Sequence, residues 1–221
     1  TAVAVTSETR SSLTGLGIGK KLDWQVIPIG ISFKDTQIKP ITAGDKVKLL
    51  WVGRFTDIKD PFYAVEVIKL LNAPSPNKFA LTMVGEGELF EQVKTAAKAL
   101  PITFTGWVVN PFKSGIDFDL LLITSKNEGL PLVMLEAAGS GRATMSRDVG
   151  GIGEFITDSK TGYLIKGDAK QMADKLIEIA TDKKSLEISG VAANQLLKER
   201  FSVEKMAKSY LSLYSSLTIS K

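Results

Sequence analysis

From residue 47 onward, apolar and polar positions alternate between two patterns. Short apolar, β-prone runs each end at a glycine or a polar residue, and the stretches between them carry apolar residues at helical spacing. The run Leu120 to Ile123 is apolar at every position, which is typical of a strand buried on both faces. The pattern predicts strands at residues 47–52, 79–84, 102–104, 119–124, 143–146 and 163–165, and helices at residues 61–72, 88–100, 131–138, 169–180, 184–198 and 202–217.

Strands that alternate with helices at these lengths predict an α/β fold, in which a Rossmann-like parallel sheet carries helices on both faces. In such sheets, ligands bind beyond the carboxyl ends of the strands. The functional residues are therefore expected in the loops that follow strands, which begin at Gly53, Gly85, Gly106 and Ser125.

The first 43 residues follow a different pattern. They hold two strand-like runs, at residues 2–5 and 24–29, with a polar segment at residues 7–21 between them. One such unit cannot bury both faces of a sheet by itself, so we place a domain boundary near Thr42 to Asp45. Because the chain opens at Thr1 inside a strand-like run, we expect it to be the interior of a longer protein.

Composition narrows the chemistry. The net charge of +4 favours anionic ligands only weakly, and no aromatic-basic cluster points to nucleic acid. The chain has no cysteine and no histidine, so any reaction must use carboxylates, amines, guanidinium groups, hydroxyls or backbone amides. No apolar run reaches the length of a membrane-spanning helix and no signal peptide is visible. We expect a cytoplasmic protein, with peripheral association at the inner face of the membrane as an open alternative.

Two carboxylates eight residues apart, Glu128 and Glu136, bracket an apolar segment after the strand at residues 119–124. On one helix they would lie about 80° apart around the axis and about 12 Å apart along it. That spacing suits contact with one elongated, hydroxyl-rich ligand at two points. An isolated pair of this kind is more often two acids flanking a helix start.

Basic residues and glycines follow two other strands. Arg54 and Lys59 come after the strand at residues 47–52, where two cations suit a diphosphate, although such residues are more often solvated surface. Gly53 permits close backbone approach there. Gly85 opens a second glycine loop, for which a simple tight turn is the more frequent interpretation.

A helix is predicted to begin near Gly129. Free amides of Gly129 and Leu130 would then face an anion, because the helix dipole adds about half a positive charge at its N-terminus. The glycine-dense run at residues 150–154 is either a site of close backbone approach or a flexible turn.

Taken in order, these motifs resemble the C-terminal half of retaining glycosyltransferases of the GT-B fold, specifically the family-4-like group (glycosyl transferases group 1). Each motif is weak alone, and their ordered co-occurrence carries the resemblance. The motifs are Val52-Gly53-Arg54 with Lys59, Val84-Gly85-Glu86-Gly87, Phe104-Thr105-Gly106, residues 119–125, Glu128-Gly129-Leu130-Pro131 through Glu136-Ala137, Gly150-Gly151-Ile152-Gly153-Glu154, and Gly162-Tyr163-Leu164.

The resemblance implies a role for each candidate residue. Arg54 and Lys59 would hold the donor diphosphate, and Glu128 would face the donor sugar; these three form the expected catalytic set. Glu136 would bind the ribose hydroxyls. The expected substrate-binding residues are Glu136, Gly129, Leu130, Gly53, Gly85, Trp107, Val108 and Val133, with Trp107 and Val108 near the base. The family generally transfers without a bound metal, so no cofactor is expected beyond the nucleotide-sugar substrate.

Two departures from the family pattern affect these expectations. Asp60 stands where the family commonly has glycine, which places a negative charge near the expected diphosphate. The chain is also short, since such enzymes have two domains of comparable size. The resemblance implies that residues 1–43 are the remnant of an acceptor-binding domain with its linker. Residues 44–200 would be the nucleotide-sugar-binding domain, and residues 201–221 a helix that packs on the N-terminal domain.

The chain is therefore expected to be a fragment or a split subunit that binds a nucleotide-sugar donor. It would need the missing domain or a partner chain to transfer the sugar efficiently, and no nucleic-acid partner is expected. Two alternatives stay open at this point. One is a domain of a GT-B-like sugar-nucleotide epimerase or phosphorylase, and the other is a non-catalytic nucleotide-binding module.

Overall fold

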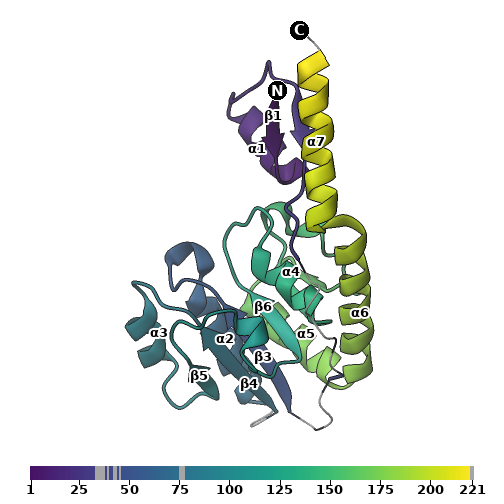
Figure 1. The fold of residues 1–221 in the computed structure, drawn as a ribbon. Helices are drawn as coiled ribbons and strands as arrows, with labels where there is room; N and C mark the ends of the chain where they lie inside the picture. Colours follow the sequence, from purple (N-terminus) through teal and green to yellow (C-terminus); the bar gives the residue numbers. More distant parts are fainter. Residues whose placement is uncertain (33–37, 39, 42–43, 45, 75–77, 220–221) are drawn as a thin grey trace.

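A computed structural model describes residues 1–32, 38, 40–41, 44, 46–74 and 78–219. The domain boundary expected near Thr42 to Asp45 falls mostly outside the described residues. The described chain forms a main parallel sheet of six strands and a small parallel sheet of two strands (Figure 1).

The main sheet has the strand order β5-β4-β3-β6-β7-β8, and every neighbouring pair is parallel. The strands predicted from residue 47 onward are confirmed to within one residue at each end. Their bounds are β3 (Val47–Val52), β4 (Phe79–Val84), β5 (Ile102–Phe104), β6 (Leu120–Ile123), β7 (Ala143–Arg147) and β8 (Tyr163–Ile165).

Helices cover both faces of this sheet, as the sequence pattern predicts. Because side chains alternate along a strand, Leu120 and Leu122 of β6 join one hydrophobic cluster while Leu121 and Ile123 join the other. The first cluster also contains side chains of α2 (Pro61–Asn72), α3 (Phe90–Ala96) and α5 (Ala169–Ala180). The second contains side chains of α4 (Leu132–Gly139) and α6 (Lys183–Arg200).

The small sheet pairs β1 (Ala2–Ala4) with β2 (Trp24–Val26) and carries α1 (Ser7–Gly15). It lies beside the long C-terminal helix α7 (Val203–Ile219), above the main sheet (Figure 1). The segment that follows β2 contacts the start of the α7 segment, where Ile31 pairs with Ser202. A Cβ at Gly30 would lie 2.4 Å from the Ser202 carbonyl oxygen, so this crossing needs a glycine.

Three elements differ from the sequence expectation. The strand expected at residues 24–29 is only β2, Trp24–Val26. The helix predicted at residues 88–100 is only α3, Phe90–Ala96. Ala97 already leaves the helical conformation, with ψ 1°, and Ala99 is left-handed with φ 68°, two residues before Pro101. The polar segment at residues 7–21 contains α1, whose first turn is capped by the Thr6 side chain. That helix has no buried residue, so it gives no apolar periodicity for the sequence pattern to detect.

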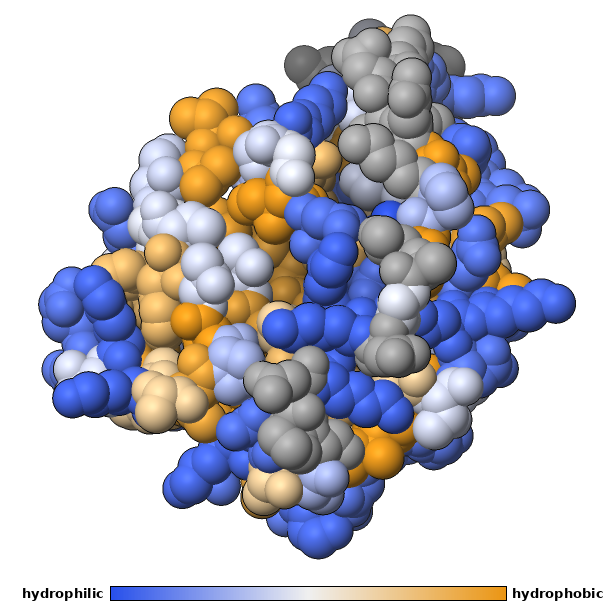
Figure 2. Space-filling model, turned by 90° about the horizontal axis from the view of Figure 1, so that it is seen from below, coloured by the Kyte–Doolittle hydropathy of each residue, from blue (hydrophilic) through white to orange (hydrophobic). Residues whose placement is uncertain are grey.

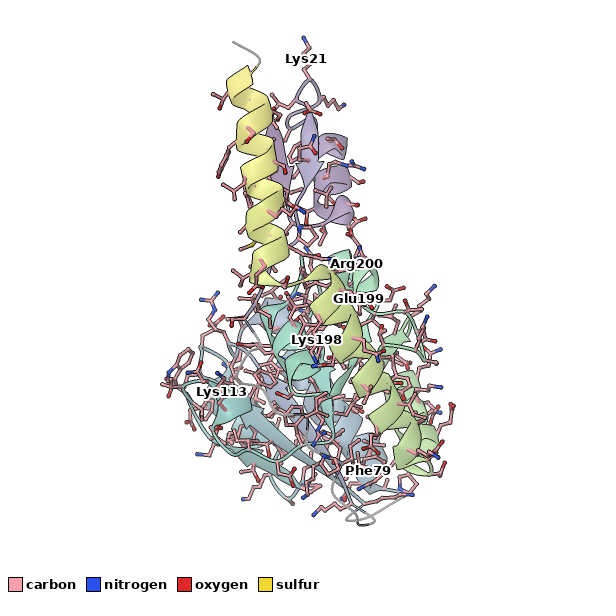
Figure 3. The ribbon with its side chains drawn as sticks, turned by 45° about the vertical axis from the view of Figure 1, so that its right-hand side comes forward. Lys21, Phe79, Lys113, Lys198, Glu199 and Arg200 are labelled. Carbon is pink, nitrogen blue, oxygen red and sulfur yellow. The ribbon has the colours of Figure 1, made fainter. Side chains whose placement is uncertain are left out.

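The two ends of the main sheet face different surroundings. Phe79 at the start of β4 lies at the bottom of the molecule, so the carboxyl ends of the parallel strands point up toward the small sheet (Figure 3). Seen from below, the opposite end mixes hydrophobic patches with a largely hydrophilic rim (Figure 2). Within the described chain, none of the helices has both the length and the apolar character needed to cross a bilayer.

Candidate functional site

The loops that follow β3, β4, β5 and β6 lie together at the upper edge of the main sheet. Backbone contacts join the first three of them, since Gly53 N donates to the Val84 carbonyl and Gly85 N donates to the Gly106 carbonyl. Gly85 has φ 130°, and a Cβ there would lie 2.0 Å from the Gly53 carbonyl oxygen. Gly85 therefore allows the loop after β4 to pack closely against Gly53, whereas a Cβ at Gly53 would meet only the Trp51 ring, at 3.2 Å.

An ion pair between Lys59 and Glu128 lies at the same edge. Lys59 Nζ is 2.5 Å from Glu128 Oε1, and Ser125 Oγ donates to the same oxygen at 2.6 Å. Lys59 ends the short helix η1 (Asp57–Lys59) after β3, and Glu128 lies in the loop after β6. The Glu128 side chain is 11% exposed and that of Lys59 is 31% exposed, so the pair is partly withdrawn from solvent.

The placement of Glu128 corrects one expectation. Glu128 and Glu136 do not share a helix, because Pro131 is extended with ψ 123° and α4 begins only at Leu132. The helical angle and rise predicted between the two acids therefore do not apply. The loop that carries Glu128 is instead held by Gly151 N, which donates to the Glu128 carbonyl at 3.0 Å.

The glycine-dense run is a site of close backbone approach. It forms the short helix η3 (Gly150–Glu154), and a Cβ at Gly150 would lie 1.7 Å from the Glu128 carbonyl oxygen. A Cβ at Gly151 would lie 2.4 Å from the Gly129 carbonyl oxygen. Of the two interpretations left open by the sequence, these contacts favour the site of close backbone approach.

Because α4 begins at Leu132, its free N-terminal amides are not the ones that the sequence predicted, those of Gly129 and Leu130. Gly129 and Leu130 precede the helix, and Gly129 lies near the Val5 and Thr9 side chains of the N-terminal unit. The first-turn N–H groups belong to Leu132 and Val133, which accordingly have no backbone acceptor within α4. Of the residues named from the sequence, Val133 is therefore the one whose backbone N–H is free at the N-terminus of the helix.

Arg54 follows Gly53 directly and is exposed. Its side chain has no ion-pair or hydrogen-bond partner within the described residues. Lys59 by contrast is fixed at its backbone, where Thr124 Oγ1 donates to the Lys59 carbonyl at 2.9 Å. The same hydroxyl accepts from the buried Trp51 indole N–H at 2.9 Å.

Glu136 lies on α4 and is half-buried, and burial raises the pKa of its carboxyl above the ordinary value. It lines a small pocket that extends along α4. The other lining residues are Ile31, Ser32, Asn110, Phe112, Lys113 and Gly139. The pocket therefore joins Glu136 to the segment that follows β5.

Trp107 and Val108, the two residues expected near a base, differ in their exposure. The Trp107 side chain is 70% exposed, whereas Val108 packs against the second hydrophobic cluster. Sequence reasoning missed Asn110 and Phe112, which line the Glu136 pocket. Asn110 adopts a left-handed conformation before Pro111, and an Asn-Pro dipeptide is a turn signal that the sequence offers.

No group of three or more acidic side chains in the described part of the chain is placed to bind a metal ion. At this edge Arg54 and Lys59 supply cations, α4 supplies first-turn amides and Glu128 supplies a carboxylate, while Glu136 lies one turn further along α4. Groups of these kinds are able to bind an anion and hydroxyls.

The sequence model of the family Glycosyl transferases group 1 matches residues 46–182, which is more than half of the chain. The chain belongs to this family. This membership confirms the resemblance drawn from the motif order, and the parallel six-stranded sheet with helices on both faces confirms the expected fold class.

Curated relatives of this glycosyltransferase family match most of the chain. The poly(ribitol-phosphate) alpha-N-acetylglucosaminyltransferase of Staphylococcus aureus is 28% identical over 174 residues, which are 75% of this chain and 34% of that protein. The N-acetyl-alpha-D-glucosaminyl L-malate synthase of Bacillus anthracis is 30% identical over 187 residues, 81% of this chain and 48% of that protein. The chain thus spans a third to a half of these two relatives.

Solved structures share the fold. TarM of S. aureus, crystallised with Fondaparinux, alpha-GlcNAc-glycerol and UDP, has a TM-score of 0.83 at 23% identity and matches 96% of this chain and 43% of its own. HepE of Anabaena, crystallised with UDP and glucose, has a TM-score of 0.81 at 17% identity and matches 97% of this chain and 62% of its own. The chain has the fold of the C-terminal part of these GT-B enzymes.

Proposed function

We propose that this chain is the donor-binding half of a retaining glycosyltransferase that moves a sugar from a nucleoside-diphosphate sugar to a glycan, lipid or small-molecule acceptor. Residues 44–200 form the nucleotide-sugar-binding domain. Residues 1–43 are the end of an acceptor-binding domain with its linker, and the helix in residues 201–221 packs on that domain.

The observation that carries this proposal is the Lys59–Glu128 pair, with 2.5 Å between Nζ and Oε1, at the carboxyl edge of a parallel sheet. A fixed lysine beside exposed Arg54 supplies two positive charges in one loop. The first-turn amides of Leu132 and Val133 add the positive end of the α4 dipole. Cations and helix amides suit the diphosphate of a donor, and they offset the negative charge that develops on the departing nucleotide.

The two carboxylates then act at separate parts of the donor. Glu128 faces the sugar from the loop after β6. Glu136 accepts hydrogen bonds from the ribose hydroxyls, and charged hydrogen bonds of this kind contribute about 1.5–3 kcal/mol each. The pocket that joins Glu136 to Asn110 and Phe112 supports placing the nucleoside along α4, toward the loop after β5.

The acceptor side of the enzyme is proposed to come from a further domain or a partner chain. Helix α7 supports this, because Leu211, Tyr214 and Leu217 on it are 65%, 58% and 47% exposed. A groove between β2 and α7 also exposes apolar and polar side chains, among them Val26 and Leu213. An added N-terminal domain would cover these surfaces. We also propose that transfer needs no metal ion and takes place in the cytoplasm, where the full enzyme associates peripherally with the membrane.

Isothermal titration calorimetry with UDP, GDP and ADP tests the proposal. At least one of them should bind the 221-residue chain, and the matching sugar nucleotides should bind as well. Sugar transfer by this chain alone should be weak, because the acceptor domain is not in it. The absence of binding by all three diphosphates at millimolar concentration would refute the donor-domain assignment.

A further inference from the structure

Asp60 follows Lys59 directly and has a backbone conformation that favours glycine. Its φ is 48° and its ψ is 58°, in the left-handed region. This residue is the C-cap of η1 and the N-cap of α2, where its Oδ1 accepts from Tyr63 N at 3.3 Å. The direction in which the chain leaves Lys59 therefore depends on a strained aspartate.

Arg147 of β7 forms an ion pair with that aspartate. Arg147 is the last residue of β7, and its Nη1 lies 3.1 Å from Asp60 Oδ2. The two side chains are 26% and 20% exposed, so water screens their charges incompletely. The negative charge expected to disturb the diphosphate near Lys59 is thus matched by a positive charge from β7.

Further contacts fix Arg147 itself. Its Nη1 also donates to the Thr124 carbonyl at 3.2 Å, and its guanidinium carbon lies 4.8 Å from the centre of the Tyr63 ring. Tyr63 OH donates in turn to the Gly167 carbonyl at 3.2 Å. Thr124 contacts both Arg147, through its carbonyl, and the Lys59 carbonyl, through its hydroxyl. Arg147 and Thr124 therefore hold the Lys59–Asp60 turn at two adjacent points.

We propose that Arg147 is a positioning residue for the diphosphate site, which neutralises Asp60 and keeps it in the left-handed turn that sets the path of Lys59. The inference rests on the proposed function of Lys59. Arg147 does not touch the donor. It makes an aspartate acceptable at a position where glycine would adopt the same turn without strain and without charge.

This dependence defines the test, which is a double-mutant cycle on the full 221-residue chain. The variants are Arg147→Ala, Arg147→Lys, Asp60→Gly, and Asp60→Gly combined with Arg147→Ala. Calorimetry measures the dissociation constant of whichever of UDP, GDP and ADP binds the wild type most tightly, and of the matching nucleoside. Circular dichroism melting establishes that each variant is folded at the temperature of the titration.

Arg147→Ala should weaken binding of the nucleoside diphosphate about tenfold, because it leaves a partly buried carboxylate unpaired beside the negatively charged diphosphate. The nucleoside should change less than about twofold, since it carries no phosphate charge. Arg147→Lys should stay close to the wild type because it keeps the positive charge. Asp60→Gly should bind the diphosphate at least as tightly as the wild type, and adding Arg147→Ala to it should then cost little.

Two results would overturn the inference while leaving the proposed function intact. One is a wild-type affinity for the diphosphate in Arg147→Ala. The other is an equal loss from Arg147→Ala in the wild-type chain and in the Asp60→Gly background, which would mean that Arg147 acts on the ligand without Asp60. If Arg147→Ala does not fold, the Asp60→Gly background still decides the question. A wild-type chain that binds none of the diphosphates refutes the proposed function, and the inference with it.

Discussion

Lys59 and Glu128 are 69 residues apart in the chain, yet Lys59 Nζ lies 2.5 Å from Glu128 Oε1. The ammonium proposed to hold a diphosphate is therefore already engaged by the carboxylate proposed to face the sugar. A bound donor would have to share Lys59 with Glu128. Glu128 should therefore weaken binding of the diphosphate, with which it competes for Lys59, and strengthen binding of the sugar, which it contacts.

The Glu128→Gln variant separates these effects. Removing the carboxylate charge releases Lys59, so a nucleoside diphosphate should bind as tightly as to the wild type or more tightly. A sugar nucleotide should lose the contact between Glu128 and its sugar, a loss of about tenfold if one charged hydrogen bond is removed. Calorimetry with matched diphosphate and sugar-nucleotide pairs gives the ratio of the two dissociation constants.

Glu187→Gln is the matched control for that variant, because Glu187 is an exposed acid on α6, outside the loops that follow the strands. It should leave both affinities within about twofold of the wild type, as expected for a screened surface charge. If Glu128→Gln instead weakened the bare diphosphate about tenfold, Glu128 would act mainly by holding Lys59 in place, and the sugar-facing role would be lost.

Glu136→Gln should affect binding and stability in opposite directions. Burial raises the pKa of Glu136 above its ordinary value of 4.5. Between the pKa of the unfolded chain and the higher pKa of the folded chain, the folded chain therefore retains a proton that the unfolded chain has lost. Folding stability therefore falls as pH rises through this range. The glutamine variant lacks this loss, so in the absence of ligand it should match or exceed the wild-type stability at neutral pH.

Urea unfolding between about pH 4 and pH 7 checks this, because the stability difference between variant and wild type should grow with pH. At neutral pH the same variant should bind the nucleoside and its diphosphate about tenfold more weakly, because the charged acceptor for ribose hydroxyls is gone. Exposed Glu91 on α3 offers a control in Glu91→Gln. An unchanged dissociation constant for Glu136→Gln would refute the ribose role.

Thr124→Val should destabilise the fold at the base of the Lys59 loop. The substitution removes the acceptor of the buried Trp51 indole N–H and the donor to the Lys59 carbonyl. An unpaired buried polar group costs about 1–3 kcal/mol, which urea unfolding measures directly. Thr218→Val is a suitable comparison, because its hydroxyl donates to the Tyr214 carbonyl on an exposed helix face. Equal effects of the two substitutions would contradict a special role for the Thr124 hydroxyl.

The sequence predicted the sheet well because its central strands β6 and β7 are buried on both faces. The continuous run at Leu120 to Ile123 left little ambiguity, and parallel strands bring their following loops to one edge. The motif order also identified the family. These features depend on residues close together in the chain, which is why sequence patterns report them.

What the sequence did not predict depends on geometry between distant segments. Pro131 could stand inside the first helical turn or before it, and only its extended conformation places Glu128 outside α4. The pairing of Asp60 with Arg147 joins residues 87 apart in the chain, which no local pattern reports. The pocket residues Asn110 and Phe112 become neighbours of Glu136 only through the packing of the segment after β5 against α4.

The central claim is that this edge of the sheet recognises the diphosphate of a nucleotide donor. Its most direct test compares Arg54→Ala with the wild type by calorimetry, using a nucleoside diphosphate and its parent nucleoside. Arg54 is exposed and has no side-chain partner within the described residues, so its removal should leave the fold intact. We predict that binding of the diphosphate weakens about tenfold or more, as expected for the loss of a charge-assisted contact. The dissociation constant of the nucleoside should change less than about twofold, since the nucleoside carries no phosphate. Equal losses for the two ligands, or no loss for the diphosphate, would contradict the account.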